Sequence, residues 1–275
     1  MTTTRFLVSI GNEVRKGLLH AWSERLQIVI ELPMFVIMII MLGPLLGQGQ
    51  NLAAGHAHWT LDPLRTAIMV AWYVPFIYFY MQIVKLFWRL LGEIQTGTVE
   101  QVYLSPLPSW LVTAAGRVTA AVAETIVVAG VTYGVVRAFV PLPMHWTIAA
   151  LVPVIMITVS AIGVSLIVAG ATMVWKRIQM INDTVLLLIF ILSASAVPLI
   201  GVPAWWSTIS RFTPLTNGVA SLYQTMFLRH SLTQQWGNGV LVWLVATAAA
   251  YLVIGILAFR LGERTAKRLG TLGRY

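Results

Sequence analysis

Ionisable side chains inside apolar segments are the first candidates for chemistry in this chain. Glu124 lies near the middle of an apolar run from 112 to 136, and Arg117 precedes it by seven residues, about 10 Å along a helix. Charged groups at such depth are costly and often mark substrate pathways. Two interpretations stay open: Glu124 and Arg117 face a substrate path, or Glu124 is paired with Arg117 or with a polar group of another helix, which is the commoner arrangement.

No other set of side chains forms a recognisable reaction centre. His56 and His58 are close in sequence, but only Asp62 could join them as a ligand, so we predict no metal site. The chain has no cysteine and therefore no zinc-thiolate site. It also lacks the Gly-x-x-x-x-Gly-Lys-Ser/Thr loop that binds nucleotide phosphates. We predict no catalytic residue and no cofactor on this chain; if ATP is used, ATP and Mg²⁺ must be bound by another polypeptide.

The composition places these residues in a membrane. Of 275 residues, 58% are hydrophobic and only 10% are charged, with a mean hydropathy of +0.82. A soluble enzyme needs a charged, mixed surface, so that class is excluded. We attribute the formal net charge of +9 to topology and contact with anionic membrane lipids, and we predict no nucleic-acid partner.

Six apolar windows are long enough to cross a hydrocarbon core about 30 Å thick. Continuous apolar runs favour helices, because barrel strands alternate in polarity over about 10 residues. We therefore predict an all-α membrane protein, a single domain over residues 1–275 with six transmembrane helices at 27–46, 67–87, 112–136, 148–174, 184–200 and 239–259.

Basic residues predict the orientation. With six spans both termini share a side, and fourteen of the 18 Lys and Arg residues fall on that side, including the run from Arg260 to Arg268. The other side holds Arg65, Arg137, Arg211 and Arg229. Because cytoplasmic loops carry the excess of basic residues, we predict a multi-pass protein of the cell (inner) membrane with both termini in the cytoplasm.

The first 25 residues have a different period from the spans. Apolar residues recur every four positions, at Phe6, Ile10, Val14, Leu18 and Trp22. Charged and polar residues lie between them, so we predict an amphipathic helix at 4–25 that lies in the membrane interface. A helix packed on a partner protein would show the same period.

Aromatic residues concentrate in the second window, at Trp72, Tyr73, Phe76, Tyr78, Phe79 and Tyr80. Trp72 and Phe76 are substrate-path candidates, because aromatic rings can line a path for a large amphipathic compound. Packing in the core or against lipid is the alternative and the simpler interpretation.

Residues 92–108 are the only cytoplasmic connection long enough to form an element of its own. Thr98 can cap a short helix together with Gln101, and Pro106 ends it. An apolar face would consist of Val99, Val102 and Tyr103. A short helix of this kind suits contact with a cytoplasmic partner, although a surface turn without a partner would use the same residues.

This segment resembles the coupling-helix region of the ABC-2 type family of ABC transporter permeases. The matching residues are Glu93, Gly97-Thr98, Val99-Glu100-Gln101 and Ser105-Pro106-Leu107. The resemblance implies two associated permease subunits, homodimeric or heterodimeric, each contacting a cytoplasmic ABC ATPase subunit that binds ATP and Mg²⁺. The residues expected at that contact are Glu93, Thr98, Glu100, Gln101, Tyr103 and Leu104.

The family architecture has counterparts elsewhere in the chain. The resemblance implies an amphipathic elbow helix, matching 4–25, and a re-entrant pair of short helices before the last span, matching the extracellular segment 201–238. Pro203, Trp205 and Pro214 suit that segment, since prolines interrupt helices and tryptophans anchor at interfaces.

These observations favour a transport subunit over an enzyme. We expect the permease of an ATP-driven exporter that moves a hydrophobic or amphipathic compound such as a drug, antibiotic or lipid by alternating access. Export of a lipid-linked polysaccharide by the same architecture is the first alternative. An intramembrane lipid-modifying enzyme, a passive channel and a structural subunit are weaker alternatives, because no convergent catalytic residues are evident.

Overall fold

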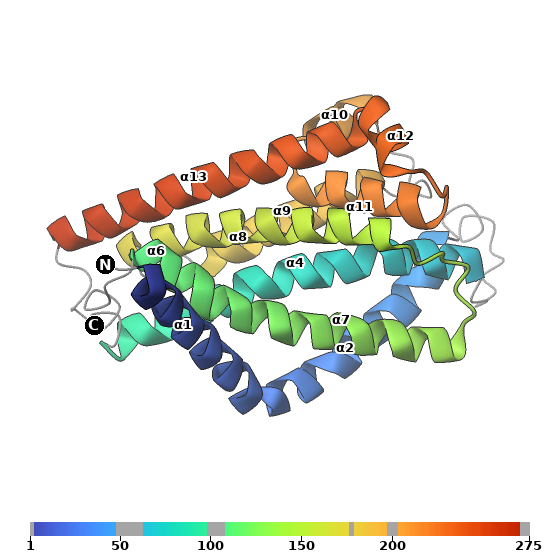
Figure 1. The fold of residues 1–275 in the computed structure, drawn as a ribbon. Coiled ribbons are helices and arrows are strands. Elements are labelled where there is room, and N and C mark those ends of the chain that lie inside the picture. The colour runs from blue at the N-terminus through green and yellow to red at the C-terminus, as the bar shows by residue number, and fades with distance from the viewer. Residues whose placement is uncertain (1–2, 48–62, 98–107, 176–178, 197–202, 270–275) are drawn as a thin grey trace.

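Each of the six apolar windows predicted from the sequence overlaps the residue range of a helix (Figure 1). The computed structural model describes residues 3–47, 63–97, 108–175, 179–196 and 203–269. The helices in chain order are α1 (Thr3–Ser23), α2 (Arg25–Gly47), α4 (Pro63–Gln95), α6 (Ser109–Val112), the π-helical η1 (Thr113–Val118), α7 (Thr119–Phe139), the 3-10 turn η2 (Ile148–Ala150), α8 (Leu151–Val174), α9 (Gln179–Ser193), the 3-10 turn η3 (Ala194–Ala196), α10 (Ala204–Ser210), α11 (Pro214–Met226), α12 (Leu232–Gly237) and α13 (Val240–Leu269).

Among the residues that the structure describes, four stretches are long and apolar enough to cross a membrane. These are Pro63–Gln95, Gly116–Phe139, Ile148–Val174 and Val240–Leu269. Shorter apolar stretches occur in α2 and α9, at Val29–Met41 and Asn182–Ser193. The chain is therefore an all-helical, multi-pass membrane protein, and the count of six spans stays a prediction.

Successive long helices run in opposite directions (Figure 1). The start of α1 and the last turns of α13 lie at one end of the bundle, which we call the terminal end. Helices α2, α7 and α9 run away from it, and α4, α8 and α13 run back. Helix α4 is central, because 72% of its most apolar stretch is buried, compared with 28% for α13.

Helix α1 crosses the outside of the bundle obliquely at the terminal end (Figure 1). It packs on η1 and α7 at a point where two glycines meet, and a Cβ on Gly17 would overlap the carbonyl oxygen of Gly116. Leu18 and Trp22, on the predicted apolar stripe, are 47% and 68% exposed. Exposed apolar residues on an oblique helix suit the membrane interface. The elbow position itself stays a prediction.

Helices α8 and α13 run parallel and in close contact (Figure 1). Gly163 faces Gly255 and Gly170 faces Gly262, and at each of these positions a Cβ would overlap backbone atoms of the other helix. Small residues let helix backbones approach closely in a membrane, where packing replaces the hydrophobic effect as the force between helices. The glycine seam, meaning these four glycines, therefore fixes α13 against α8.

Three short helices fill the connection between α9 and α13. The longest, α11, has 13 residues and spans about 20 Å, which is too short to cross the hydrocarbon core. Polar contacts hold it in place: Asn217 Nδ2 donates to Thr247 Oγ1 of α13 at 3.3 Å, and Ser221 Oγ donates to Gln235 Oε1 of α12 at 2.5 Å. The re-entrant path predicted for 201–238 stays a prediction.

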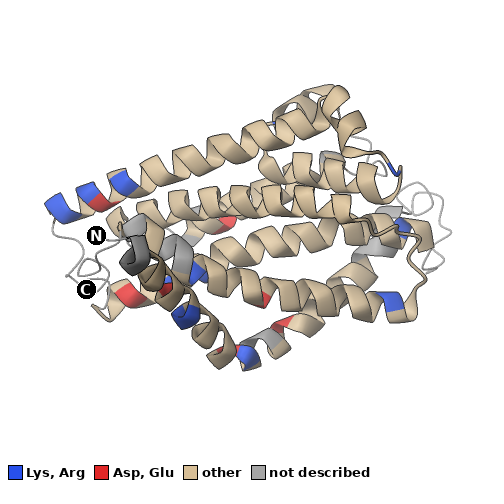
Figure 2. Ribbon diagram, viewed as in Figure 1, with Lys and Arg blue, Asp and Glu red and all other residues tan. Residues whose placement is uncertain are grey.

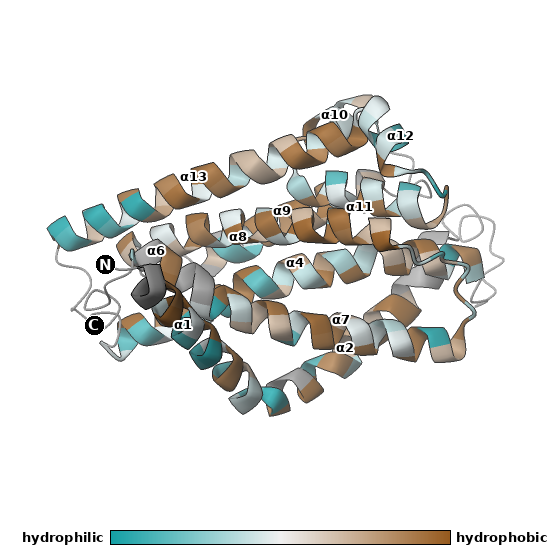
Figure 3. Ribbon diagram, in the orientation of Figure 1, coloured by the Kyte–Doolittle hydropathy of each residue, from teal (hydrophilic) through white to brown (hydrophobic). Residues whose placement is uncertain are grey.

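Charge and hydropathy divide the bundle along its length. Basic residues gather on the last turns of α13 and on α1 at the terminal end (Figure 2). The middle of α13 is hydrophobic and its final turns are hydrophilic (Figure 3). The terminal end is thus the end for which the count of basic residues predicts a cytoplasmic location.

Candidate functional site

Charged side chains from four helical segments meet inside the bundle toward the terminal end. They come from the α1–α2 junction, α2, the last third of α4, and the η1–α7 region. This charge cluster consists of Glu24, Glu31, Lys85, Arg89, Glu93, Arg117 and Glu124. The cluster contains three cations and four carboxylates, so its formal net charge is only −1.

Helix α4 supplies the centre of the charge cluster. Lys85, Arg89 and Glu93 follow one another at intervals of four residues, which places them on one face of the helix. The side chains of Lys85 and Arg89 are only 7% and 6% exposed. Buried cations persist in a bundle when carboxylates neutralise them, and the partners come from the flanking helices.

Glu124 is the innermost acid, with a side chain that is 0% exposed. It accepts a hydrogen bond from Arg89, and its other oxygen lies 3.6 Å from Lys85 Nζ. Glu124 is therefore paired with polar groups of another helix, and the role of Glu124 and Arg117 in a substrate path stays a prediction. The partners are on α4, because Arg117, seven residues earlier on the same segment, turns to another acid.

Arg117 forms a two-point contact with Glu93. Its Nε donates to Glu93 Oε1 at 3.1 Å, and Nη2 donates to Oε2. Arg89 Nη1 also donates to the carbonyl oxygen of Arg117 at 3.3 Å. Guanidinium–carboxylate pairs of this form fix orientation as well as charge. They tie the last turns of α4 to the start of the α7 segment.

Glu24 and Glu31 bring the first two helices to the same cations. Arg89 Nη2 donates to Glu24 Oε2 at 2.6 Å, and Lys85 Nζ lies 3.6 Å from Glu31 Oε1 and 4.0 Å from Glu24 Oε2. Burial raises the pKa of Glu24, but its hydrogen bond to Arg89 and the charges of Arg89, His20 and Lys85 outweigh burial and hold that pKa below its ordinary value. Glu24 is thus favoured in its ionised form.

Lys85 is placed to exchange partners. Its ammonium group has three carboxylates at 3.6 to 4.0 Å and no hydrogen bond to any residue that the structure describes. Open cavities of about 540 Å³ and 370 Å³ flank the ion pairs, the first beside Glu31 and the second beside Gly17. The arrangement can hold helices together and can rearrange, because no single geometry satisfies the lysine.

The segment predicted to contact an ATPase follows the charge cluster directly. Glu93 belongs to both, and α4 ends two residues later at Gln95. Gly97 then adopts a φ of 73°, a left-handed conformation that suits glycine at a helix end. The remaining predicted contact residues, which lie outside the described residues, are Thr98, Glu100, Gln101, Tyr103 and Leu104.

Trp72 and Phe76 belong to α4, and their rings pack against α9. The indole of Trp72 donates to Ser193 Oγ at 2.9 Å and stacks on Phe190, with ring centroids 4.9 Å apart. Phe76 contacts the same ring at 4.5 Å. These contacts give both residues a packing role, as the simpler interpretation held, and their role in a substrate path stays a prediction.

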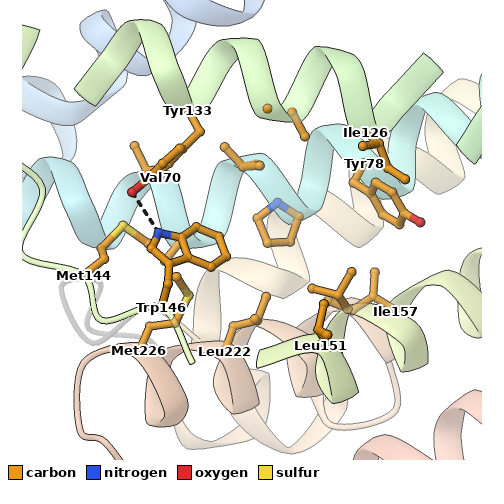
Figure 4. Close-up of a pocket in the computed structure, with 16 residues that line it drawn as sticks. Val70, Tyr78, Ile126, Tyr133, Met144, Trp146, Leu151, Ile157, Leu222 and Met226 are labelled. Atoms are coloured by element: carbon orange, nitrogen blue, oxygen red, sulfur yellow. Dashed lines mark hydrogen bonds between the residues drawn. The ribbon is translucent and has the colours of Figure 1, made fainter. Parts of the chain in front are cut away.

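A separate apolar cavity of about 300 Å³ lies between α4, α7, α8 and α11 (Figure 4). Its lining includes Val70 and Tyr78 from α4, Ile126 from α7 and Leu222 from α11. Its volume is at the lower limit of ligand sites, roughly 300–1,000 Å³. Of these residues the sequence singles out only Tyr78, as one of the aromatic residues in the second window that either line a substrate path or pack in the core.

The described residues contain no group of three or more His, Cys, Asp or Glu that could hold a metal ion. His56 and His58 lie outside them. The sequence analysis also missed Lys85 and Arg89 as site residues, because it used them only to assign orientation. Their spacing of four residues, continued by Glu93, was the available signal.

Comparison with known protein families gives one match. The family model described as ABC-2 type transporter matches residues 13–227, which is more than half of the 275 residues. The match begins within α1 and ends just beyond α11, so it includes the whole charge cluster. No curated protein matches the sequence.

Proposed function

Because this chain belongs to the ABC-2 type transporter family, we propose that it is the permease subunit of an ATP-driven exporter of hydrophobic or amphipathic compounds. Drugs, antibiotics and lipids are the substrate classes that we expect. The family is one of membrane transport subunits, and it normally works with an ATPase subunit. The observation that carries our proposal is the charge cluster, which joins three parts of the bundle directly before the predicted ATPase contact.

The proposed arrangement has two permease subunits and two ABC ATPase subunits on the cytoplasmic side. The terminal end faces the cytoplasm, so residues 98–107 meet the ATPase there. ATP and Mg²⁺ are bound by the ATPase, and this chain supplies the moving helices. The basic residues on α13 and α1 support this orientation.

The charge cluster would transmit the motion of the ATPase. A displacement at residues 98–107 reaches the last turn of α4, where Glu93 holds Arg117 at the start of the α7 segment. One turn further into the bundle, Arg89 holds both Glu24 and Glu124. The three ion pairs make α1, α4 and α7 move together, and exchange among the carboxylates around Lys85 gives the group a second arrangement.

The experiment is to purify the full chain together with its ATPase and reconstitute the complex in vesicles. We expect the double variant Glu100→Ala/Tyr103→Ala to keep ATP hydrolysis but lose stimulated transport of a lipophilic dye. Glu263→Ala is the matched control, because Glu263 pairs with Lys267 within α13.

Two results would contradict different parts of the proposal. Failure of any ATPase to co-purify with the chain would overturn the transporter function. A complex in which Glu100→Ala/Tyr103→Ala couples hydrolysis to transport like the control would overturn the assignment of residues 98–107 alone.

A further inference from the structure

Basic side chains surround another pocket, at the end of the bundle opposite the terminal end. The pocket has a volume of about 580 Å³, and its lining includes Arg137, His145, Arg229 and His230. No carboxylate of the described residues lines it. A pocket of two arginines and two histidines without an acid is complementary to an anion.

The pocket is built by three separate segments that are fixed to one another. The backbone N–H of His145 donates to the carbonyl oxygen of Met226 at 3.1 Å, which ties the loop after α7 to the end of α11. The side chain of Arg229 contacts His145 Nε2, and Arg137 Nη1 donates to the hydroxyl of Tyr133 at 2.9 Å. The basic groups are thus held on α7, on its loop and after α11 before any ligand arrives.

Two features of this pocket are unfavourable for the residues that form it. Arg229 has a φ of 54°, a left-handed conformation that is uncommon outside glycine. His230 Nδ1 is buried and has no hydrogen-bond partner among the residues that the structure describes. Buried polar atoms normally form hydrogen bonds, so this nitrogen can bond a ligand that enters the pocket.

The basic pocket adjoins the apolar cavity, because Met144 and Trp146 line both. The indole of Trp146, a residue shared by the two linings, donates to the Tyr133 hydroxyl of α7 at 2.8 Å (Figure 4). Ile126 and Leu151, which line the apolar cavity, are 59% and 55% exposed. The apolar cavity therefore opens sideways, at the exposed surface between α7 and α8.

We propose that the two volumes form one site for an anionic phospholipid of the surrounding bilayer. The phosphate lies among Arg137, Arg229 and the histidines, and an acyl chain enters the apolar cavity from the side. This occupant fits because the basic groups are at the end of the bundle, at headgroup depth, and the apolar volume extends inward from them. The proposal is independent of which compound is exported.

The test measures lipid retention by the full-length protein in a non-ionic detergent. The protein is exposed to equal amounts of phosphatidylglycerol and phosphatidylcholine, washed, and analysed by native mass spectrometry. We expect preferential retention of phosphatidylglycerol. The double variant Arg137→Gln/Arg229→Gln should reduce that preference by roughly tenfold or more, the order expected when two cationic contacts at a membrane surface are lost.

A second variant tests the apolar half without touching a charge. Gly130 lines the apolar cavity and has open space where a Cβ would lie, so Gly130→Phe should fill the cavity and reduce retention of both lipids. Gly134, one turn further along α7, also has open space but does not line the cavity, and Gly134→Phe is the matched control. Arg211→Gln is the control for charge at the same end of the bundle.

The proposal fails if the unmodified protein retains the two lipids equally, or if Arg211→Gln lowers the preference as much as the double variant. It also fails if inorganic phosphate binds with the same dependence on Arg137 and Arg229 while Gly130→Phe leaves lipid retention unchanged. That last result would assign a site for free anions in place of a phospholipid site.

Discussion

Helices α8 and α13 pack through glycines, whereas α1, α4 and α7 meet through ion pairs. In the glycine seam each backbone occupies the space that a Cβ would need, so the two helix backbones are in direct contact with no side chain between them at these positions. In the charge cluster, three carboxylates lie 3.6 to 4.0 Å from the ammonium group of Lys85, so this group has more than one carboxylate with which it can pair. The difference separates a fixed part of the bundle from a part that can change its arrangement.

Among the variants that compare the charge cluster with the glycine seam, removal of Glu124 should cause the largest loss of stability. Glu124→Ala leaves Arg89 and Lys85 buried without their innermost partner, a loss that typically destabilises by about 3–5 kcal/mol. The measurement is thermal unfolding in detergent, followed by tryptophan fluorescence. Glu263→Ala, which breaks an ion pair between neighbouring turns of α13, should cost less than about 1 kcal/mol. Equal losses in the two variants would show that the cluster is not a buried unit.

Adding a side chain to the glycine seam should have the next largest effect. Gly255→Val forces α13 away from Gly163 on α8, and overpacking of this kind costs about 1–3 kcal/mol. Gly134→Ala is the control, because a Cβ there meets open space and alanine favours a helix. If Gly255→Val unfolds at the same temperature as the unmodified protein, the close approach of the two helices is wrong.

Exchanging the charges of the Glu93–Arg117 pair should have a smaller effect, and the double exchange should restore part of what each single exchange loses. Glu93→Arg and Arg117→Glu alone each place like charges in contact, whereas the double exchange restores an opposite pair. We expect each single variant to lower coupling of ATP hydrolysis to transport, and the double variant to recover at least half of the loss. A double-mutant cycle measures the interaction, about 0.5–3 kcal/mol for residues in contact. Additive losses without recovery would contradict a direct pair.

Acidification should give the smallest change in stability. Of the two regions compared, only the charge cluster should respond to it, because the glycine seam contains no titratable group. The pKa of Glu24 is lower in the folded protein than its ordinary value of 4.5, so its pairing contributes full stability above about pH 4.5. That contribution is lost as the pH falls through the folded-state pKa. The difference in unfolding temperature between the unmodified protein and Glu24→Gln should therefore shrink from pH 7 to pH 4. A difference that grows on acidification would show that the pKa shift has the opposite sign.

The sequence predicted the helices far better than it predicted their partners. The window 148–174 coincides with η2 and α8, and the elbow at 4–25 with α1, because apolar length and period are local properties. The fifth window was placed at 184–200, whereas α9 spans Gln179–Ser193, since the polar residues of its first turn hid its beginning. Boundaries follow from capping and packing as well as from hydropathy.

Within the site, the burial of Glu124 could be predicted from the sequence, but the residues that pair with it could not. Glu124 was recognisable as a buried charge in an apolar run. Its partner Arg89 is 35 residues away, and only the packing of α4 against α7 brings the two together. Two glycine pairs, each with a spacing of seven residues, were an available signal for the seam between α8 and α13, but the spacing indicates close packing only once the two helices are known to be neighbours.

The glycine seam also sets the order in which the protein can be completed during synthesis. About 85 residues separate Gly170 from Gly255, and a ribosome adding 5–20 residues per second needs roughly 4 to 17 s to make them. For those seconds the glycine face of α8 has lipid where α13 will later lie. Helix α13 lies outside the stretch that matches the family, yet it covers this face of α8. A nascent chain stalled before residue 240 would therefore be inserted in the membrane with its closest helix contact still unmade.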